Sequence, residues 1–307
     1  MTNKILTFIL FIYVSVLLPY AVYTKKNNYD ESYFIKYIMQ EFMVAAFKHG
    51  YNGTLYMKNS HEITTNDNNI DIIIANHTSR FDDILLIIIT LHKFNISNYN
   101  FIYNKDNLHL IPGLGIFLKS SYDIGIDKNY SKDYYTIING LNKINKKKNK
   151  EFIIIFPEGR IITKDKLEKD QLYSKENNIP IYNNLLMPKT RGVFLIIEYL
   201  KYLKRLGDVW DFTIYNNINN YYIDINKVTI NYTCYDNFKL EFYKIWQNKD
   251  KLLENKKNNT EYNKIFFRNN YTLLLLLISI IVLQSVALCN FKYFILFIIK
   301  IAYHYFF

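Results

Sequence analysis

The stretch Ile70–Ala75 has the sequence IDIIIA, and Asn76-His77 follows it directly. A short run of β-branched residues with little alternation is typical of a strand buried on both faces. Phe152–Phe156 (FIIIF) has the same character. Two such strands predict a parallel sheet that is covered by helices on both sides.

Segments with strand and helix character alternate around these two runs. Strands are predicted at Tyr99–Tyr103, Ile124–Ile126, Val209–Tyr215 and Val228–Tyr232, and helices at Asp82–Leu91, Tyr134–Leu141 and Val193–Leu203. This alternation indicates an α/β domain with helices covering a mostly parallel sheet. The Lys-rich stretch Asn142–Lys150 is expected to be a solvated loop. Glu31–Phe47 has apolar residues at helical spacing, which fits either an amphipathic helix on a membrane or a helix packed on the core.

Long apolar segments lie near both ends of the sequence. Ile5–Tyr23 carries no charge and as a helix would span about 28 Å, close to the ~30 Å hydrocarbon thickness of a bilayer. An uncleaved anchor is favoured over a signal peptide because no small-residue cleavage site precedes Lys25. Tyr271–Asn290 and Phe291–Phe307 indicate two further membrane segments, with buried core helices as the alternative. The expected organisation is a membrane anchor with an amphipathic helix in 1–50, a central domain in 51–268 and membrane segments in 269–307.

Basic residues determine the expected orientation and partners. Lys and Arg outnumber Asp and Glu by 38 to 27, which gives a net charge of +11. Lys25 and Lys26 follow the first apolar segment, so the positive-inside rule places the central domain on the cytoplasmic face of the membrane. The expected membrane is that of the endoplasmic reticulum, with another organelle as the alternative. The charge suits an anionic membrane surface or an anionic substrate. Nucleic acid is not an expected partner, because no RRM, helix-turn-helix or zinc-finger pattern is present.

Several enzyme classes lack their local signatures in this chain. The sequence has no GxxxxGK[ST], GxGxxG, HExxH or GxSxG motif. Its two cysteines, Cys234 and Cys289, exclude a disulfide framework and a cysteine-based zinc site. We therefore expect neither a metal nor a resident cofactor.

Polar residues follow the strand Ile70–Ala75 at His77 and Asp82. Ligands of open α/β sheets bind at the carboxyl ends of the strands. With His77 in the loop and Asp82 in the first turn of the next helix, the carboxylate can accept a hydrogen bond from one imidazole nitrogen. The other nitrogen is then available as a general base. The alternative is a helix-capping histidine and a surface aspartate.

The second buried strand ends in Pro157-Glu158-Gly159-Arg160. Proline fixes the turn, and glycine permits a close approach of the backbone. Two strands that deliver functional side chains to one sheet edge predict a catalytic or binding site there.

The motifs NHTSRFDD (76–83) and FPEGR (156–160), in this order, resemble those of the glycerophospholipid (lysophospholipid) acyltransferase family, which joins an HxxxxD motif to an FPEG motif. Segments 105–115, 122–128 and 186–192 resemble other blocks of the family, and 156–192 is most similar to the lysocardiolipin acyltransferase-like branch. The resemblance implies transfer of a fatty acyl chain from acyl-CoA, a co-substrate, to a hydroxyl of lysophosphatidic acid or another lysophospholipid.

The resemblance also implies roles for individual residues. His77 would be the general base, Asp82 would orient it, and transfer would be direct, without an acyl-enzyme. The residues expected to bind substrate are Glu158, Gly159, Arg160, Lys128, Lys105 and Pro188. The cations would bind phosphate, Glu-Gly would shape the acceptor site, and the proline would shape the acyl-CoA side. Lys128 stands where the family usually has Arg, and lysine keeps the charge but loses the bidentate fork. Arg160, which stands where the family usually has Thr, is a candidate to supply that fork.

Two functions of other classes remain as alternatives. One is a catalytically inactive, membrane-anchored lipid-binding protein of the same fold, against which the intact His77, Asp82 and Glu158 argue. The other is a basic peripheral module for acidic lipids, which would not need HxxxxD at a strand end. The motifs leave lysophosphatidic acid and other lysophospholipids open as acceptors.

Overall fold

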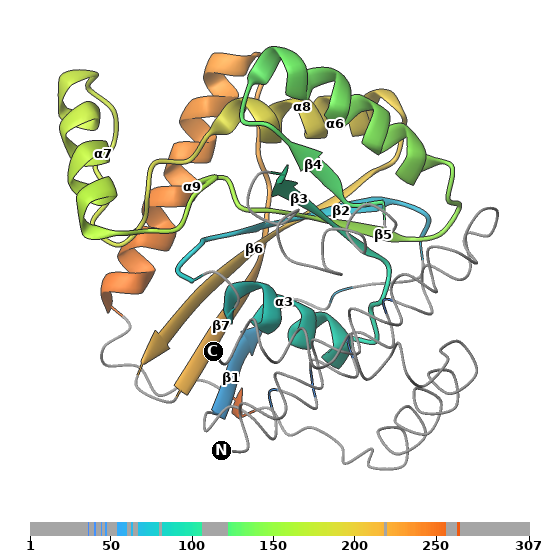
Figure 1. Ribbon diagram of the computed structural model, residues 1–307, viewed down its shortest axis with the longest axis horizontal. Helices are drawn as coiled ribbons and strands as arrows, with labels where there is room; N and C mark the ends of the chain where they lie inside the picture. The colour runs from blue at the N-terminus through green and yellow to red at the C-terminus, as the bar shows by residue number, and fades with distance from the viewer. Residues whose placement is uncertain are drawn as a thin grey trace, which may run out of the picture.

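The computed structural model describes residues 36, 40, 44, 47, 54–59, 63, 67–79, 82–105, 122–217, 220–255 and 263–264 (Figure 1). The strands are β1 (Thr54–Asn59), β2 (Ile70–Ala75), β3 (Tyr99–Asn104), β4 (Ile124–Ile126), β5 (Glu151–Ile155), β6 (Leu206–Asn217), β7 (Asn220–Val228) and β8 (Asn263–Lys264). The helices are α3 (Asp82–Lys93), α6 (Tyr130–Asn145), α7 (Lys164–Glu176), α8 (Thr190–Tyr202) and α9 (Tyr235–Asn255).

In the described ranges, the strands form one eight-stranded sheet with the order β4-β3-β5-β2-β6-β7-β1-β8. Neighbours from β4 to β6 are parallel, β6 and β7 form an antiparallel pair, β1 is parallel to β7, and β8 is antiparallel to β1. The predicted mostly parallel α/β sheet with flanking helices is confirmed. The two isoleucine-rich strands, β2 and β5, are paired near its centre.

The core has two layers, one on each face of the sheet. Ile73 and Ala75 of β2 pack in the layer that contains α3, whereas Ile70, Ile72 and Ile74 pack in the layer formed by α6, α8 and α9 (Figure 1). All six residues of β2 are buried. The burial of both faces explains why this strand lacks the alternation of a half-exposed one.

Most predicted elements are found: β2 and β4 have the predicted bounds, and the others have shifted ends. The prediction of a strand at Val228–Tyr232 is wrong, because β7 precedes it and ends at Val228. Its alternation of apolar and polar residues belongs to a loop whose Ile230 and Tyr232 pack on the second core layer. The strand β1 and the helices α7 and α9 were not predicted.

The expected solvated loop at Asn142–Lys150 is also wrong in part. Helix α6 continues to Asn145, and Lys147 and Lys150 are buried. Lys147 pairs with Glu151 at 3.5 Å, and Lys150 pairs with Asp71 at 2.7 Å. Burial lowers the pKa of Lys147 to about 8. These lysines can be buried because the carboxylates of Glu151 and Asp71, near the starts of β5 and β2, compensate their charges.

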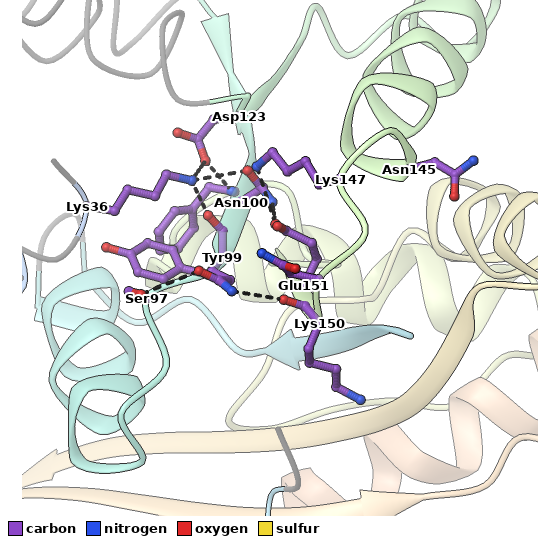
Figure 2. A network of polar contacts seen from close by, with 12 residues as sticks. Lys36, Ser97, Tyr99, Asn100, Asp123, Asn145, Lys147, Lys150 and Glu151 are labelled. Carbon is purple, nitrogen blue, oxygen red and sulfur yellow. Dashed lines mark hydrogen bonds and ion pairs between the residues drawn. The ribbon is translucent and has the colours of Figure 1, made fainter. Parts of the chain in front are cut away.

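A polar network joins an N-terminal helical segment to the sheet (Figure 2). The described residues of the predicted helix Glu31–Phe47 are Lys36, Gln40, Val44 and Phe47, all helical and buried. Lys36 donates to the Tyr99 carbonyl and to Asn100 Oδ1, and Gln40 donates to the Ile96 carbonyl at 2.6 Å. This face of the helix packs on the α/β core, which is one of the two expected alternatives.

The expected membrane segments Ile5–Tyr23, Tyr271–Asn290 and Phe291–Phe307 lie outside the described residues. Among the helices of the described ranges, none combines the length and the apolar character needed to cross a bilayer.

Candidate functional site

The end of β2 carries an imidazole paired with a carboxylate. His77 Nδ1 lies 3.0 Å from Asp83 Oδ2, and the two side chains are 17% and 1% exposed. His77 is in the loop after β2, and Asp83 is in the first turn of α3. The histidine and the start of the next helix therefore meet at the predicted sheet edge. The predicted partner, Asp82, opens α3, but its side chain is outside the described set and its role stays a prediction.

Asp83 also organises the loop that carries His77. Its carboxylate accepts hydrogen bonds from the amides of Thr78 and Ser79 at 2.5 and 2.9 Å, and from the Thr78 hydroxyl at 2.6 Å. One buried carboxylate thus fixes both the backbone of the loop and the Nδ1 side of the imidazole. Such an arrangement selects one tautomer and leaves Nε2 to exchange protons.

The segment that follows β5 holds His77 from another side. Its amide donates to Glu158 Oε1 at 3.4 Å, and its carbonyl accepts the Ile162 amide at 3.2 Å. Its ring stacks on Phe156, with centroids 4.6 Å apart. The predicted meeting of the two strand ends at one site is therefore observed: the HxxxxD loop and the FPEG turn are in direct contact.

Asn76 fixes the strand end itself. Its side-chain amide donates to the Ile214 carbonyl and accepts from the Ile214 amide, both at 2.8 Å. A single buried side chain thereby extends the β2–β6 pairing beyond the last residue of β2. The position of His77 is set by this extension.

The Glu158-Gly159 turn is tight and buried. Gly159 has φ +65°, a left-handed conformation that glycine adopts without strain, and its amide donates to the Phe156 carbonyl at 2.9 Å. Glu158 is 1% exposed, and its burial raises its pKa to about 8. Its Oε2 is buried without a hydrogen-bond partner in the described part of the chain. The turn thus places a buried carboxyl group beside His77.

Three cationic side chains gather next to this turn. Burial, followed by the positive charges of Lys128 and Arg160, lowers the pKa of Lys189. The Lys189 amide donates to the Pro157 carbonyl at 2.8 Å, which ties this residue to the turn. Asp170, which pairs with Arg160, acts on Lys189 in the opposite direction. The cluster of three cations and one carboxylate keeps a net positive charge, which suits a phosphate group.

Arg160 is the most constrained cation of the cluster. Its Nη2 pairs with Asp170 Oδ1, while Asp170 Oδ2 accepts the Met187 amide at 3.0 Å. Within the described ranges, Arg160 Nε is buried and has no hydrogen-bond partner. The guanidinium is thus held on one side by Asp170, while the side chain as a whole is 35% exposed.

The remaining predicted residues lie at the same sheet edge. Lys105 follows β3 and pairs with Asp127 at 3.0 Å, with both side chains partly exposed. Pro188 is buried and directly precedes Lys189. In the part of the chain that the structure describes, no group of three His, Cys, Asp or Glu side chains is arranged to hold a metal ion.

Asp83 and Lys189 were not predicted as site residues. The signal for Asp83 is the second aspartate of the FDD sequence, which spacing alone does not distinguish from the first. Lys189 lies inside the quoted 186–192 block, but only the fold brings it onto the Glu-Gly turn. Asn76 likewise gains its role from β6, which is far away in the sequence.

Comparisons with known proteins identify relatives of this chain. A probable 1-acyl-sn-glycerol-3-phosphate acyltransferase 5 of Arabidopsis thaliana is 26% identical over 143 residues, which are 47% of this chain and 37% of that protein. Lysocardiolipin acyltransferase 1 of Danio rerio is 25% identical, with the same coverage. The chain thus aligns with well under half the length of these relatives.

The fold also matches a solved structure. The crystal structure of the 1-acyl-sn-glycerophosphate acyltransferase PlsC from Thermotoga maritima aligns with a TM-score of 0.55 and 14% identity, over 83% of this chain and 97% of that one. The model of the Acyltransferase family matches residues 57–214, about half of the chain, and this range contains both motifs. The chain therefore belongs to the acyltransferase family, as the HxxxxD and FPEG motifs predict.

Proposed function

We propose that this protein transfers a fatty acyl chain from acyl-CoA to a hydroxyl of lysophosphatidic acid or another lysophospholipid. The observation that carries the proposal is the His77–Asp83 pair, 3.0 Å apart, in contact with the turn that bears Glu158 and the cationic cluster. A general base beside an anion site is what O-acylation of a phosphate-bearing alcohol requires. The names of the relatives support the same class of acceptor.

In the proposed reaction, the acceptor hydroxyl attacks the thioester carbonyl of acyl-CoA while His77 Nε2 takes its proton. Asp83 stabilises the resulting imidazolium, and the predicted Asp82 is a second candidate for this role. The tetrahedral intermediate then collapses to the ester, and the imidazolium protonates the departing thiolate of coenzyme A. General-base catalysis of this kind contributes roughly 10²- to 10⁴-fold.

Lys128, Arg160 and Lys189 would hold the phosphate of the acceptor during this reaction. Arg160 would do so through its partly exposed guanidinium, and the two lysines through their point charges. Gly159, with no side chain, leaves Lys189 room beside the turn, since a Cβ at this position would lie 3.5 Å from Lys189 Nζ. Lys105 and Pro188 stay predictions for the phosphate and acyl-CoA sides.

We also propose that the domain works at a membrane surface, on the cytoplasmic face of the endoplasmic reticulum or another organelle. The support is the net charge of +11 and the apolar stretches Ile5–Tyr23 and Tyr271–Phe307. Both substrates are amphiphiles, so a membrane location would bring them to the site.

The test is acyl transfer by the purified full chain with labelled acyl-CoA and a panel of lysophospholipids. The wild type should acylate at least one phosphate-bearing acceptor, and His77→Ala should lower kcat by about 10³-fold. His92→Ala, on the same side of the sheet but in the last turn of α3, is the matched control and should retain activity. Binding of lipid without transfer by the wild type would show an inactive lipid-binding protein. Full activity in His77→Ala would overturn the mechanism.

A further inference from the structure

Lys249 of helix α9 is buried in the interior, near the start of the loop that carries His77. The side chain of Lys249 is 0% exposed. Its Nζ donates to the Phe212 carbonyl at 3.1 Å and to the Ile74 carbonyl at 3.5 Å, and it pairs with Asp211 at 2.5 Å. A buried ammonium is costly unless it is paired and hydrogen-bonded, and these partners meet both needs.

The partners of Lys249 lie at the last rungs of the β2–β6 pair. In the register of these strands, Ile74 is opposite Asp211, and Ala75 is opposite Phe212. Asn76 and His77 follow at once. Lys249 therefore joins the two strands by hydrogen bonds and an ion pair, at the point where β2 ends and the loop that carries His77 begins.

Lys249 also acts on the buried Glu158 through its positive charge. Burial is the main cause of the raised pKa of Glu158, and the negative charge of Asp83 on α3 adds to it. The amides of His77 and Leu186 and the positive charge of Lys249 act in the opposite direction. Lys249 is thus the cation from α9 that favours the ionised form of Glu158.

We propose that Lys249 is a positioning residue: it fixes the carboxyl end of β2 and thereby holds His77 against Asp83 and Glu158. It touches no substrate and acts through the backbone of β2 and β6. The kinetic part of this inference rests on the proposed acyl transfer, whereas the structural part does not. Lys249 lies outside residues 57–214, the range that matches the family model.

Two substitutions and a matched control test the proposal. Lys249→Met removes the charge and the donors at similar length, and Lys249→Gln keeps a donor without the charge. Lys150→Met is the control, because Lys150 is equally buried and pairs with Asp71 near the amino end of the same strand, away from His77. Thermal unfolding identifies the variants that fold.

Amide hydrogen exchange gives a readout that does not depend on activity. In Lys249→Met, exchange of residues 74–79 should become about 10-fold faster or more, and Lys150→Met should leave this segment unchanged. In the transfer assay, kcat of Lys249→Met should fall about 10-fold or more, because displacement of a catalytic group is costly, while KM changes less than about threefold. Lys249→Gln should be intermediate.

The outcomes separate this inference from the proposed function. Unchanged exchange of 74–79 in an active, folded Lys249→Met protein would overturn the positioning role and leave the acyl transfer intact. Faster exchange of 74–79 in Lys249→Met, together with no acyl transfer by the wild type, would contradict the proposed function but leave the positioning role intact. If Lys150→Met changed the exchange of 74–79 as much as Lys249→Met, the change would reflect a general loss of stability. If both Lys249 variants failed to fold while Lys150→Met folded, Lys249 would be required for folding rather than for positioning His77. Either result overturns the proposal.

Discussion

The Nδ1 atom of His77 lies 3.0 Å from the Oδ2 atom of Asp83, and the same oxygen accepts the Ser79 amide at 2.9 Å. The carboxylate is therefore shared between the imidazole and the backbone of the loop. Because Asp83 is almost fully buried, water does not compete for these hydrogen bonds. Orientation of His77 and closure of the loop are coupled through one side chain.

Replacement of Asp83 by Asn should lower kcat for acyl transfer by about 10²- to 10⁴-fold. The amide keeps the shape but loses the charge that stabilises an imidazolium, and its nitrogen cannot accept from the loop amides. Steady-state kinetics of the purified variant provide the measurement. Asp82→Asn is the matched comparison, since the two aspartates are adjacent. Near wild-type kcat in Asp83→Asn, with a large loss in Asp82→Asn, would transfer the orienting role to Asp82.

The cationic cluster should govern affinity for the acceptor phosphate. We expect Arg160→Gln to raise KM for lysophosphatidic acid by about 10-fold, the size of one lost charge-assisted hydrogen bond, with a smaller change in kcat. KM should also rise with added salt, because screening weakens the attraction between the partly exposed cations and phosphate. Lys175→Gln, an exposed change of the same charge in the last turn of α7, should behave as the wild type. An equal rise in KM for monoacylglycerol, which has no phosphate, would contradict a phosphate role for Arg160.

Asn76→Ala should be costly for stability as well as for catalysis. The substitution leaves the amide and carbonyl of Ile214 buried without their partner, at about 1–3 kcal/mol for each group. Denaturant unfolding measures the loss, with the exposed Asn177→Ala at the end of α7 as the control. A loss no larger than that of Asn177→Ala would show that water replaces the Asn76 side chain.

The sheet was predictable because its central strands are specified locally. Ile70–Ala75 has the same bounds in the prediction and in the structure, since burial on both faces produces a continuous apolar run. β1 (TLYMKN) and α9 have weaker patterns, and they are stabilised by contacts with distant strands and loops. For example, Trp246 of α9 donates a hydrogen bond to the Leu186 carbonyl, and no local sequence pattern predicts this contact.

The motifs located the site but not its detailed contacts. His77, Glu158 and Gly159 follow buried strands, so their meeting at one edge followed from parallel pairing. The choice between Asp82 and Asp83 depends on the first turn of α3, which spacing does not resolve. Lys189 directly precedes α8, and Lys249 belongs to α9. In a Lys-rich chain, such residues cannot be told from the many solvated lysines.

Glu158 should make folding stability depend on pH in an unusual direction. Its pKa is raised to about 8 in the folded state by burial, so between its ordinary value and pH 8 the unfolded chain releases a proton that the folded chain retains. Ionisation then favours unfolding, and stability falls as pH rises through this window, by up to about 1.4 kcal/mol per pH unit for one proton. Glu158→Gln has no such proton, so the difference in unfolding free energy between variant and wild type should grow from pH 5 to pH 8 and level off above it. Denaturant unfolding at several pH values measures this difference. A difference that stays constant, or shrinks as pH rises, would show that Glu158 is already ionised in the folded protein at pH 5.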